Sequence, residues 1–282
     1  MLNFDGQIYK QFITSLSVKT SSSYRYREVK HINIMIVNIK KIIFTFLTGI
    51  LIITSSYGQV DESLNLVDGK GLKQGKWEKT DTHGRILYQG QFVDDIPFGT
   101  FTYYDSVGKV KAITEFFNKG SRAYTKIFDK GFIVSEGEYI KEQKNGLWKF
   151  YNQDSIVIAE ENYINGIPHG TWKIYYHDGN LLDEVQYVNG TKEGNWIQYF
   201  SDGAVKTKAT YKKGKLEGLA TFYHPNGRVF ISGPYINNLK DGIWMHLDDK
   251  GVTEKREVWT GGFLKSEEYY NKATERMVKE EK

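Results

Sequence analysis

A tryptophan that follows a glycine by two residues recurs along this chain with a period of 24 residues, and this period limits the possible folds more than any other feature. The repeats are anchored by Gly75 with Trp77, Gly99 with Phe101, Gly146 with Trp148, Gly170 with Trp172, Gly194 with Trp196, Gly218 with Ala220, and Gly242 with Trp244. The longer interval between Gly99 and Gly146 holds one full repeat and one that is a residue shorter, centred on Ala123. Eight tandem copies therefore lie between Lys70 and Gly262.

Each copy has the composition of a β-hairpin. In the copy at 170–190, residues 171–176 are rich in aromatic and β-branched side chains, which favour a strand. A turn at 177–180 precedes a second strand-like segment at 181–188, and Asn189-Gly190 opens the link to the next copy. A lone hairpin is only marginally stable in water, so the copies must stack. The sequence predicts an all-β fold in which tandem hairpins form one elongated, twisted antiparallel sheet.

An aromatic row three residues after the tryptophan position is the candidate binding surface. Its members are Tyr104, Tyr151, Tyr175, Tyr199 and Tyr223. Because side chains alternate between faces along a strand, this row is expected on the face opposite the tryptophans. Tyrosine offers a large contact area with few rotors and a hydroxyl that can stay hydrated. The competing interpretations are that this row is buried and the tryptophans face outward, or that a curled sheet buries both.

The third copy departs from the pattern. Ala123 replaces the glycine, Thr125 replaces the tryptophan, and Phe132 takes the place of the turn glycine. The copy is also one residue short. These changes predict either sequence drift with a local kink, or a bend or surface that serves a specific partner.

The repeat pattern resembles a known family. The segment GTWKIYYHDG at 170–179 fits it best, and the segments that begin at Gly194 and Gly146 follow. This pattern is similar to the MORN repeat, in the variant found in bacterial proteins, and the resemblance covers Lys70–Gly262. It implies stacked hairpins and supplies no site residues. Bacterial proteins of this kind are often labelled YwqK-type antitoxin components of toxin–antitoxin systems, which implies binding and neutralising a partner.

The segments outside the repeats have distinct compositions. Residues 35–58 have a positive start, an apolar stretch at 42–53 and small residues before Gln59, as in a Sec-type signal peptide. The apolar stretch is short for a membrane span, although an N-terminal anchor is the alternative. Residues 1–34 are expected to be a non-native extension, 59–69 a linker, and 263–282 a charged cap or tail of helical or frayed character. The mature chain is expected in the periplasm, on the outer surface or outside the cell, with no transmembrane segment.

The repeats carry no recognisable catalytic motif. There is no cysteine, and His83, His169, His177 and His224 occupy turn positions without metal-ligand spacing. Residues 59–282 have 31 basic and 32 acidic side chains, so nucleic acid is not an expected partner. A site of convergent carboxylates on separate strands is the remaining catalytic alternative.

The sequence thus predicts a non-catalytic protein without cofactor or metal. Tandem repeats, the absence of recognisable chemistry and a nearly neutral mature chain favour a protein-interaction scaffold in the cell envelope. An antitoxin or immunity-type protein that neutralises a toxin, and a glycan-binding envelope protein, are the alternatives.

Overall fold

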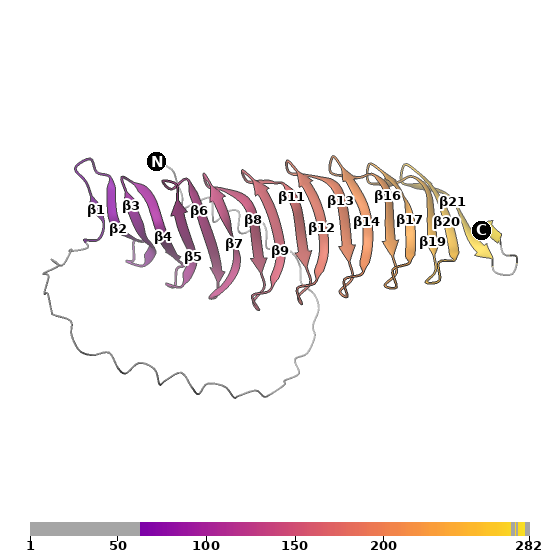
Figure 1. The fold of residues 1–282 in the computed structure, drawn as a ribbon, viewed down its shortest axis with the longest axis horizontal. Helices are drawn as coiled ribbons and strands as arrows, with labels where there is room; N and C mark the ends of the chain where they lie inside the picture. Colours follow the sequence, from indigo (N-terminus) through magenta and orange to yellow (C-terminus); the bar gives the residue numbers. More distant parts are fainter. Residues whose placement is uncertain (1–62, 272–273, 275, 280–282) are drawn as a thin grey trace, which may run out of the picture. The chain divides into compact units, whose positions relative to one another are not determined.

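The computed structural model describes residues 63–271, 274 and 276–279. In this part the chain forms one open antiparallel sheet of 22 strands, in which neighbours in space are also neighbours along the sequence (Figure 1). The short strands β10, β15 and β18 pair with the same neighbour as the strand that follows each of them. The predicted all-β architecture of stacked hairpins is confirmed. The segments interpreted as an N-terminal extension and a signal peptide, 1–34 and 35–58, lie outside the described residues.

The strands follow one another in chain order. The first half of the sheet contains β1 (Leu66–Val67), β2 (Lys73–Thr80), β3 (Ile86–Val93), β4 (Ile96–Tyr104), β5 (Val110–Phe117), β6 (Arg122–Asp129), β7 (Phe132–Ile140), β8 (Gln143–Tyr151), β9 (Val157–Ile164), β10 (Ile167–Pro168) and β11 (Gly170–Tyr175). The second half contains β12 (Leu181–Val188), β13 (Thr191–Tyr199), β14 (Val205–Lys212), β15 (Lys215–Leu216), β16 (Gly218–Tyr223), β17 (Val229–Ile236), β18 (Leu239–Lys240), β19 (Gly242–Leu247), β20 (Thr253–Thr260), β21 (Phe263–Asn271) and β22 (Arg276–Lys279).

Eight hairpins correspond to the eight sequence repeats. Repeat one is β2–β3 and repeat eight is β19–β20, while β10, β15 and β18 begin the first strands of repeats five, seven and eight. The hairpin loops are tight: the Tyr176 carbonyl accepts the Gly179 N–H at 3.0 Å, and Gly179 has a φ of 88°. Successive hairpins are joined by link turns such as Asn189-Gly190, where both residues have positive φ, as a two-residue type I′ turn requires.

The anchor glycines mark a bulge at the start of each repeat. Gly170 has a φ of 82°, a conformation that costs a residue with a Cβ atom more than it costs glycine. The pairing register shifts at the corresponding place between neighbouring repeats, for example between Val185 and Tyr187. The glycine row is therefore explained by backbone conformation.

The third repeat has lost this bulge and keeps its pairing. Ala123 pairs with Phe116 in a regular ladder, and Thr114 and Thr125 place their hydroxyl oxygens 3.0 Å apart. Thr125 stands where every other repeat except the one with Ala220 carries an aromatic ring. The missing residue lies in the hairpin loop, which is reduced to the two-residue turn Lys130-Gly131. The strands from β5 to β8 stay paired, each with the next, so the departures change local turns without interrupting the sheet.

The two ends of the sheet extend beyond the predicted repeat boundaries. Within the expected linker 59–69, β1 pairs with β2, and the Trp77 indole donates to the Leu66 carbonyl at 3.1 Å. At the other end, the expectation of a helical segment is wrong for Phe263–Asn271, which forms β21 against β20. The reason is that β20 presents unpaired backbone groups along its edge, and these outweigh the helix propensity of the charged tail.

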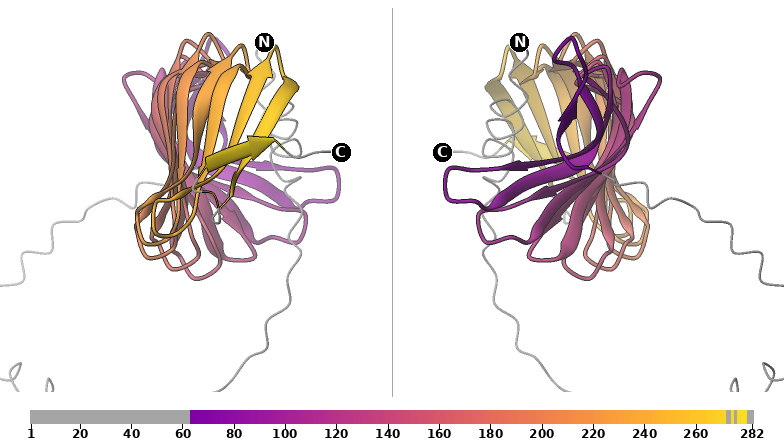
Figure 2. Two further views of the ribbon diagram at one scale, coloured as in Figure 1. Left: turned by 90° about the vertical axis from the view of Figure 1, so that its right-hand side faces the viewer. Right: turned by 90° about the vertical axis from the view of Figure 1, so that its left-hand side faces the viewer.

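The sheet has one self-packed face. We call the side that carries the tryptophan register the tryptophan face, and the side that carries the Tyr175 row the tyrosine face. The buried apolar side chains are Phe92, Phe101, Phe116, Ala123, Trp148, Val185, Ala209, Ala220 and Trp244. All of them occupy registers of the tryptophan face. Figure 2 shows that the strands bend along their length and that the sheet twists from one end to the other.

Candidate functional site

Some rings of the tryptophan face are fully buried because a glycine on the neighbouring strand leaves room for them. Trp148 is 0% exposed and Trp244 is 1% exposed. A Cβ atom built on Gly137 would lie 2.4 Å from the Trp148 ring, and one on Gly233 would lie 2.3 Å from the Trp244 ring. Each glycine therefore provides the space that the ring on the neighbouring strand occupies.

Polar partners complete this packing. The indole N–H of Trp148 donates to the Glu138 carbonyl at 3.0 Å, and that of Trp244 donates to the Pro234 carbonyl at 3.1 Å. The Lys144 ammonium lies 4.6 Å from the centre of the Trp148 ring, in cation–π contact. These rings are occupied by contacts within the chain, so this part of the tryptophan face is structural.

The end of the tryptophan face near β20 contains a buried carboxylate. Glu257 is 5% exposed and receives the Trp259 indole N–H at 2.7 Å. The Lys255 and Lys240 ammonium groups lie 2.8 and 3.4 Å from its oxygens, and His246 Nε2 lies 3.3 Å away. Burial raises the pKa of Glu257, but the hydrogen bonds from Lys255 and Trp259 outweigh burial and lower the pKa to about 2. The carboxylate is thus ionised and fully surrounded, as in a structural ion cluster.

The tyrosine face contains the candidate binding row. Three of its members donate their hydroxyl to an acidic or amide side chain of the preceding hairpin: Tyr104 to Gln89 at 2.7 Å, Tyr151 to Glu136 at 2.5 Å, and Tyr175 to Glu160 at 2.8 Å. Burial, followed by the hydrogen bond to Glu160, raises the pKa of Tyr175 to about 12. These three rings are half-buried, and their hydroxyls link one repeat to the next.

The last two members of the row differ from the first three. The Tyr199 and Tyr223 hydroxyls form no hydrogen bond within the described residues. For Tyr223 the reason is that Lys208 occupies the acceptor position on the preceding hairpin, and an ammonium group has no acceptor atom. On the same face, Leu219 is 64% exposed four residues before Tyr223 on β16, and Ile243 is 46% exposed at the equivalent position of β19. We call these four residues the tyrosine–leucine patch.

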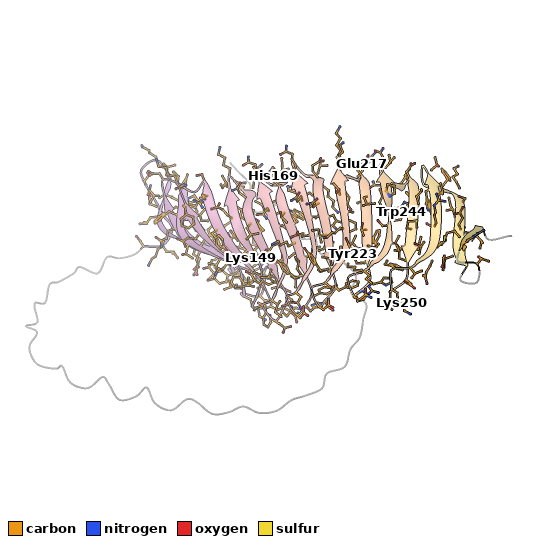
Figure 3. The ribbon with its side chains drawn as sticks, turned by 45° about the vertical axis from the view of Figure 1, so that its right-hand side comes forward. Lys149, His169, Glu217, Tyr223, Trp244 and Lys250 are labelled. Atoms are coloured by element: carbon orange, nitrogen blue, oxygen red, sulfur yellow. The ribbon has the colours of Figure 1, made fainter. Side chains whose placement is uncertain are left out.

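A polar row at the link edge includes one of the histidines in its register. Glu193, Glu217 and Asp241 each accept a backbone N–H from the following link turn, at 2.6 to 2.9 Å. His169 occupies the same register, and Figure 3 shows His169 and Glu217 near the upper edge of the sheet, opposite Lys250 in a hairpin loop. The position of His169 thus matches a register that connects neighbouring turns.

The tyrosine face also carries a row of alternating charges that the sequence analysis did not identify. Lys126, Glu136, Lys149, Glu160, Lys173 and Glu184 are cross-strand neighbours on β6, β7, β8, β9, β11 and β12. The sequence does contain this pattern: a lysine follows Trp148 and Trp172 by one residue, and a glutamate follows each of them by twelve residues. Only the pairing of the strands brings the lysines and the glutamates side by side across the sheet. We call this row the charge ladder.

The described part of the chain shows no cluster of metal-binding side chains. Residues 63–271, 274 and 276–279 hold no group of three or more side chains suited to a metal ion. They also contain no helix long and apolar enough to cross a membrane. What the geometry provides is a rigid, regular surface with one self-packed face and one face of tyrosine, charge and exposed apolar side chains.

The fold and its repeated contacts define a protein of tandem β-hairpins, and comparison with protein families makes the class more specific. The family model described as the MORN repeat variant matches residues 144–165, 168–189, 192–213 and 216–237. These four segments coincide with repeats four to seven, and the other hairpins share their period. No curated protein matches the chain.

Solved structures overlap the chain only weakly. TarM from S. aureus is 15% identical, with a TM-score of 0.28, and the overlap covers 42% of this chain and 20% of that one. A TarM variant in complex with fondaparinux, a GlcNAc-glycerol and UDP gives the same TM-score of 0.28 at 14% identity, over 42% of this chain and 21% of that chain. A porin-like protein from Bacteroides uniformis is 9% identical over 67% of this chain and 91% of that one, with a TM-score of 0.17. The chain therefore spans about a fifth of the TarM length, and no functional inference follows from overlaps of this size.

Proposed function

We propose that this chain is an exported, non-catalytic scaffold that binds a protein partner through the tyrosine–leucine patch. One observation carries this proposal. Leu219 and Ile243 are 64% and 46% exposed on the same face as two tyrosines whose hydroxyls are unbonded in the described structure, whereas the equivalent tyrosines of earlier repeats are held by Gln89, Glu136 and Glu160. Exposed apolar side chains beside tyrosines are typical of protein-binding surfaces.

The architecture supports binding in preference to catalysis. MORN repeats are generally protein-interaction modules, and four of the hairpins match that family. The contacts between hairpins are repeated along the sheet, so the surface is rigid and loses little conformational entropy when a partner docks. Export rests on the leader sequence 35–58 and places the partner in the cell envelope. A toxin would be one partner of this kind and would make the protein an antitoxin.

The test is cross-linking capture with the tagged mature chain, 59–282, from the envelope of its own host. Leu219→Asp and Ile243→Asp should each abolish capture of the same protein, because both place a charge in the apolar contact. Val107→Asp is the matched control, since Val107 is exposed in a hairpin loop far from the patch. Circular dichroism melts establish that all three variants remain folded.

Two results would overturn this proposal. The first is capture that is unchanged in both patch variants. The second is recovery of an envelope polysaccharide with no protein, which would favour the glycan-binding alternative. Finding residues 1–58 intact in a cytosolic fraction would remove the export part of the proposal.

A further inference from the structure

The charge ladder is not satisfied within the chain. Of its neighbouring pairs, Lys126 and Glu136 form an ion pair, at 3.9 Å. Lys149 and Lys173 are each flanked by glutamates on both sides, yet within residues 63–271 neither ammonium group forms an ion pair. The carboxylates of Glu136 and Glu160 are turned instead toward tyrosine hydroxyls. Within the described residues, the charged groups of Lys149, Lys173 and Glu184 thus have neither an ion-pair nor a hydrogen-bond partner on an open face.

The order of charges in this row has a symmetry property. It reads lysine, glutamate, lysine, glutamate, lysine, glutamate from β6 to β12, so its two halves are opposite in sign about the midpoint between β8 and β9. A two-fold axis parallel to the strands at that midpoint places Lys149 over Glu160 of a second copy. The same rotation places Glu136 over Lys173 of the second copy, and Lys126 over Glu184. Every charge then faces an opposite charge.

The protruding and recessed parts of the tyrosine face can be compared about the same two-fold axis. On the β6 to β8 side, next to the ladder, Tyr124 is 40% exposed and Leu147 is 42% exposed. An open depression of about 350 Å³ begins at Leu147 itself and extends over the strands β9 to β13, where its lining includes Asn162, Thr171 and Gln186. The two-fold rotation brings the strands that carry the protruding side chains over the strands that line the depression. Shape and charge therefore point to the same arrangement.

We propose that two copies of this chain pack through their tyrosine faces, about a two-fold axis parallel to the strands between β8 and β9. The interface is isologous, because each copy contributes the same ladder. Aligned packing of two sheets at a spacing of about 10 Å leaves room for the facing lysine and glutamate side chains. The charge ladder lies on repeats three to five and shares no residue with the tyrosine–leucine patch of repeats six to eight, so this inference rests on different observations from the proposed function.

The test uses sedimentation velocity on the mature chain. The wild-type protein should dimerise, and the dimer should weaken as salt is raised, because facing surface charges are screened. Lys149→Glu and Glu160→Lys should each weaken dimerisation at least about a hundredfold, since each places like charges together twice across the axis. Lys208→Glu is the matched control, on the same face and in the same register as the glutamates but outside the ladder.

Mixing the two variants gives the sharpest result. In a one-to-one mixture, the new carboxylate of Lys149→Glu faces the new ammonium group of Glu160→Lys, and the remaining facing pair is Glu160 with Lys149. The mixture should therefore form a heterodimer although neither variant dimerises alone, a rescue that a role confined to one chain cannot produce. If either variant fails to fold, Glu136→Lys and Lys173→Glu form an equivalent pair.

Three outcomes would overturn the proposal. The first is a wild-type chain that stays monomeric at every salt and protein concentration tested. The second is a dimer that persists in both single variants. The third is a mixture of the two folded variants that stays monomeric although each variant alone dimerises less than the wild type.

Discussion

The tryptophan face and the tyrosine face are built from alternate residues of the same strands, yet their side chains differ in what they contact. Trp148 and Trp244 settle over glycines and are fully buried, with their indole N–H groups bonded to backbone carbonyls. Tyr175 is only half-buried, and Tyr223 lacks a hydroxyl partner in the described structure. In a single-layer sheet each side chain points to one face only. One face can therefore stabilise the fold while the other remains available for binding.

The comparison predicts that the largest losses of stability come from the tryptophan face. Trp148→Ala should lower the free energy of unfolding by about 3–5 kcal/mol, because it removes a ring that is completely buried. Trp172→Ala should cost less, since Trp172 is only half-buried. Denaturant titration of both variants measures the difference. Equal losses for the two tryptophans would show that burial of the ring does not set its contribution.

The buried carboxylate predicts a pH dependence that belongs to the tryptophan face. The pKa of Glu257 is lowered from 4.5 to about 2 in the folded chain, so its stabilisation is present above pH 4.5 and is lost as the pH falls toward 2. The loss is at most about 3 kcal/mol, at 1.36 kcal/mol per pKa unit. Glu257→Gln should remove this part of the acid dependence measured by denaturation between pH 5 and pH 2. Glu184→Gln, on the tyrosine face, should leave it unchanged, and a lost dependence in both variants would contradict the assignment.

The glycines beneath the rings can be tested by adding one methyl group. Gly233→Ala should cost about 1–3 kcal/mol, because its Cβ would overlap the Trp244 ring. Combined with Trp244→Ala the cost should be less than additive, since Ala209 already lies opposite Ala220 in the neighbouring repeats without conflict. A thermodynamic cycle of the four proteins measures the coupling, and strictly additive losses would refute the contact.

The smallest expected change in unfolding free energy distinguishes two members of the tyrosine row. Tyr175→Phe should lower the unfolding free energy by about 1 kcal/mol, because it removes the hydrogen bond to Glu160. Tyr223→Phe should change it by close to zero, because that hydroxyl has no partner among the described residues. Thermal denaturation of the two variants provides the measurement. A loss in Tyr223→Phe as large as that in Tyr175→Phe would show that the row is uniform.

Much of the fold could be predicted from the sequence because the repeat makes local signals accumulate. Each hairpin is specified by its own turn glycine and β-prone strands, and eight copies in register leave one way to stack them. The tail was not predictable in this way. Its charged residues favour a helix in isolation, but the open edge of β20 offers Phe263–Asn271 backbone partners that a helix cannot use.

The candidate site was only partly predictable for a related reason. Alternation along a strand suggested which side Tyr175 faces, but it could not show that its hydroxyl is bonded to Glu160 of the preceding repeat. The charge ladder was missed because its lysines and glutamates belong to different strands. Their common height depends on the pairing of Lys149 with Glu160 and of Lys173 with Glu160.

The sequence by itself determined the period, the hairpins and the order of the strands, since these depend on residues within 24 positions of one another. The tertiary structure alone decided which rings are fully buried, which tyrosines keep an unbonded hydroxyl and where the charges meet. The physical reason is that these properties arise from contacts between repeats. A ring at Trp148 is buried only because the strand beside it has no side chain at Gly137, and the register that brings the two together exists only in the assembled sheet.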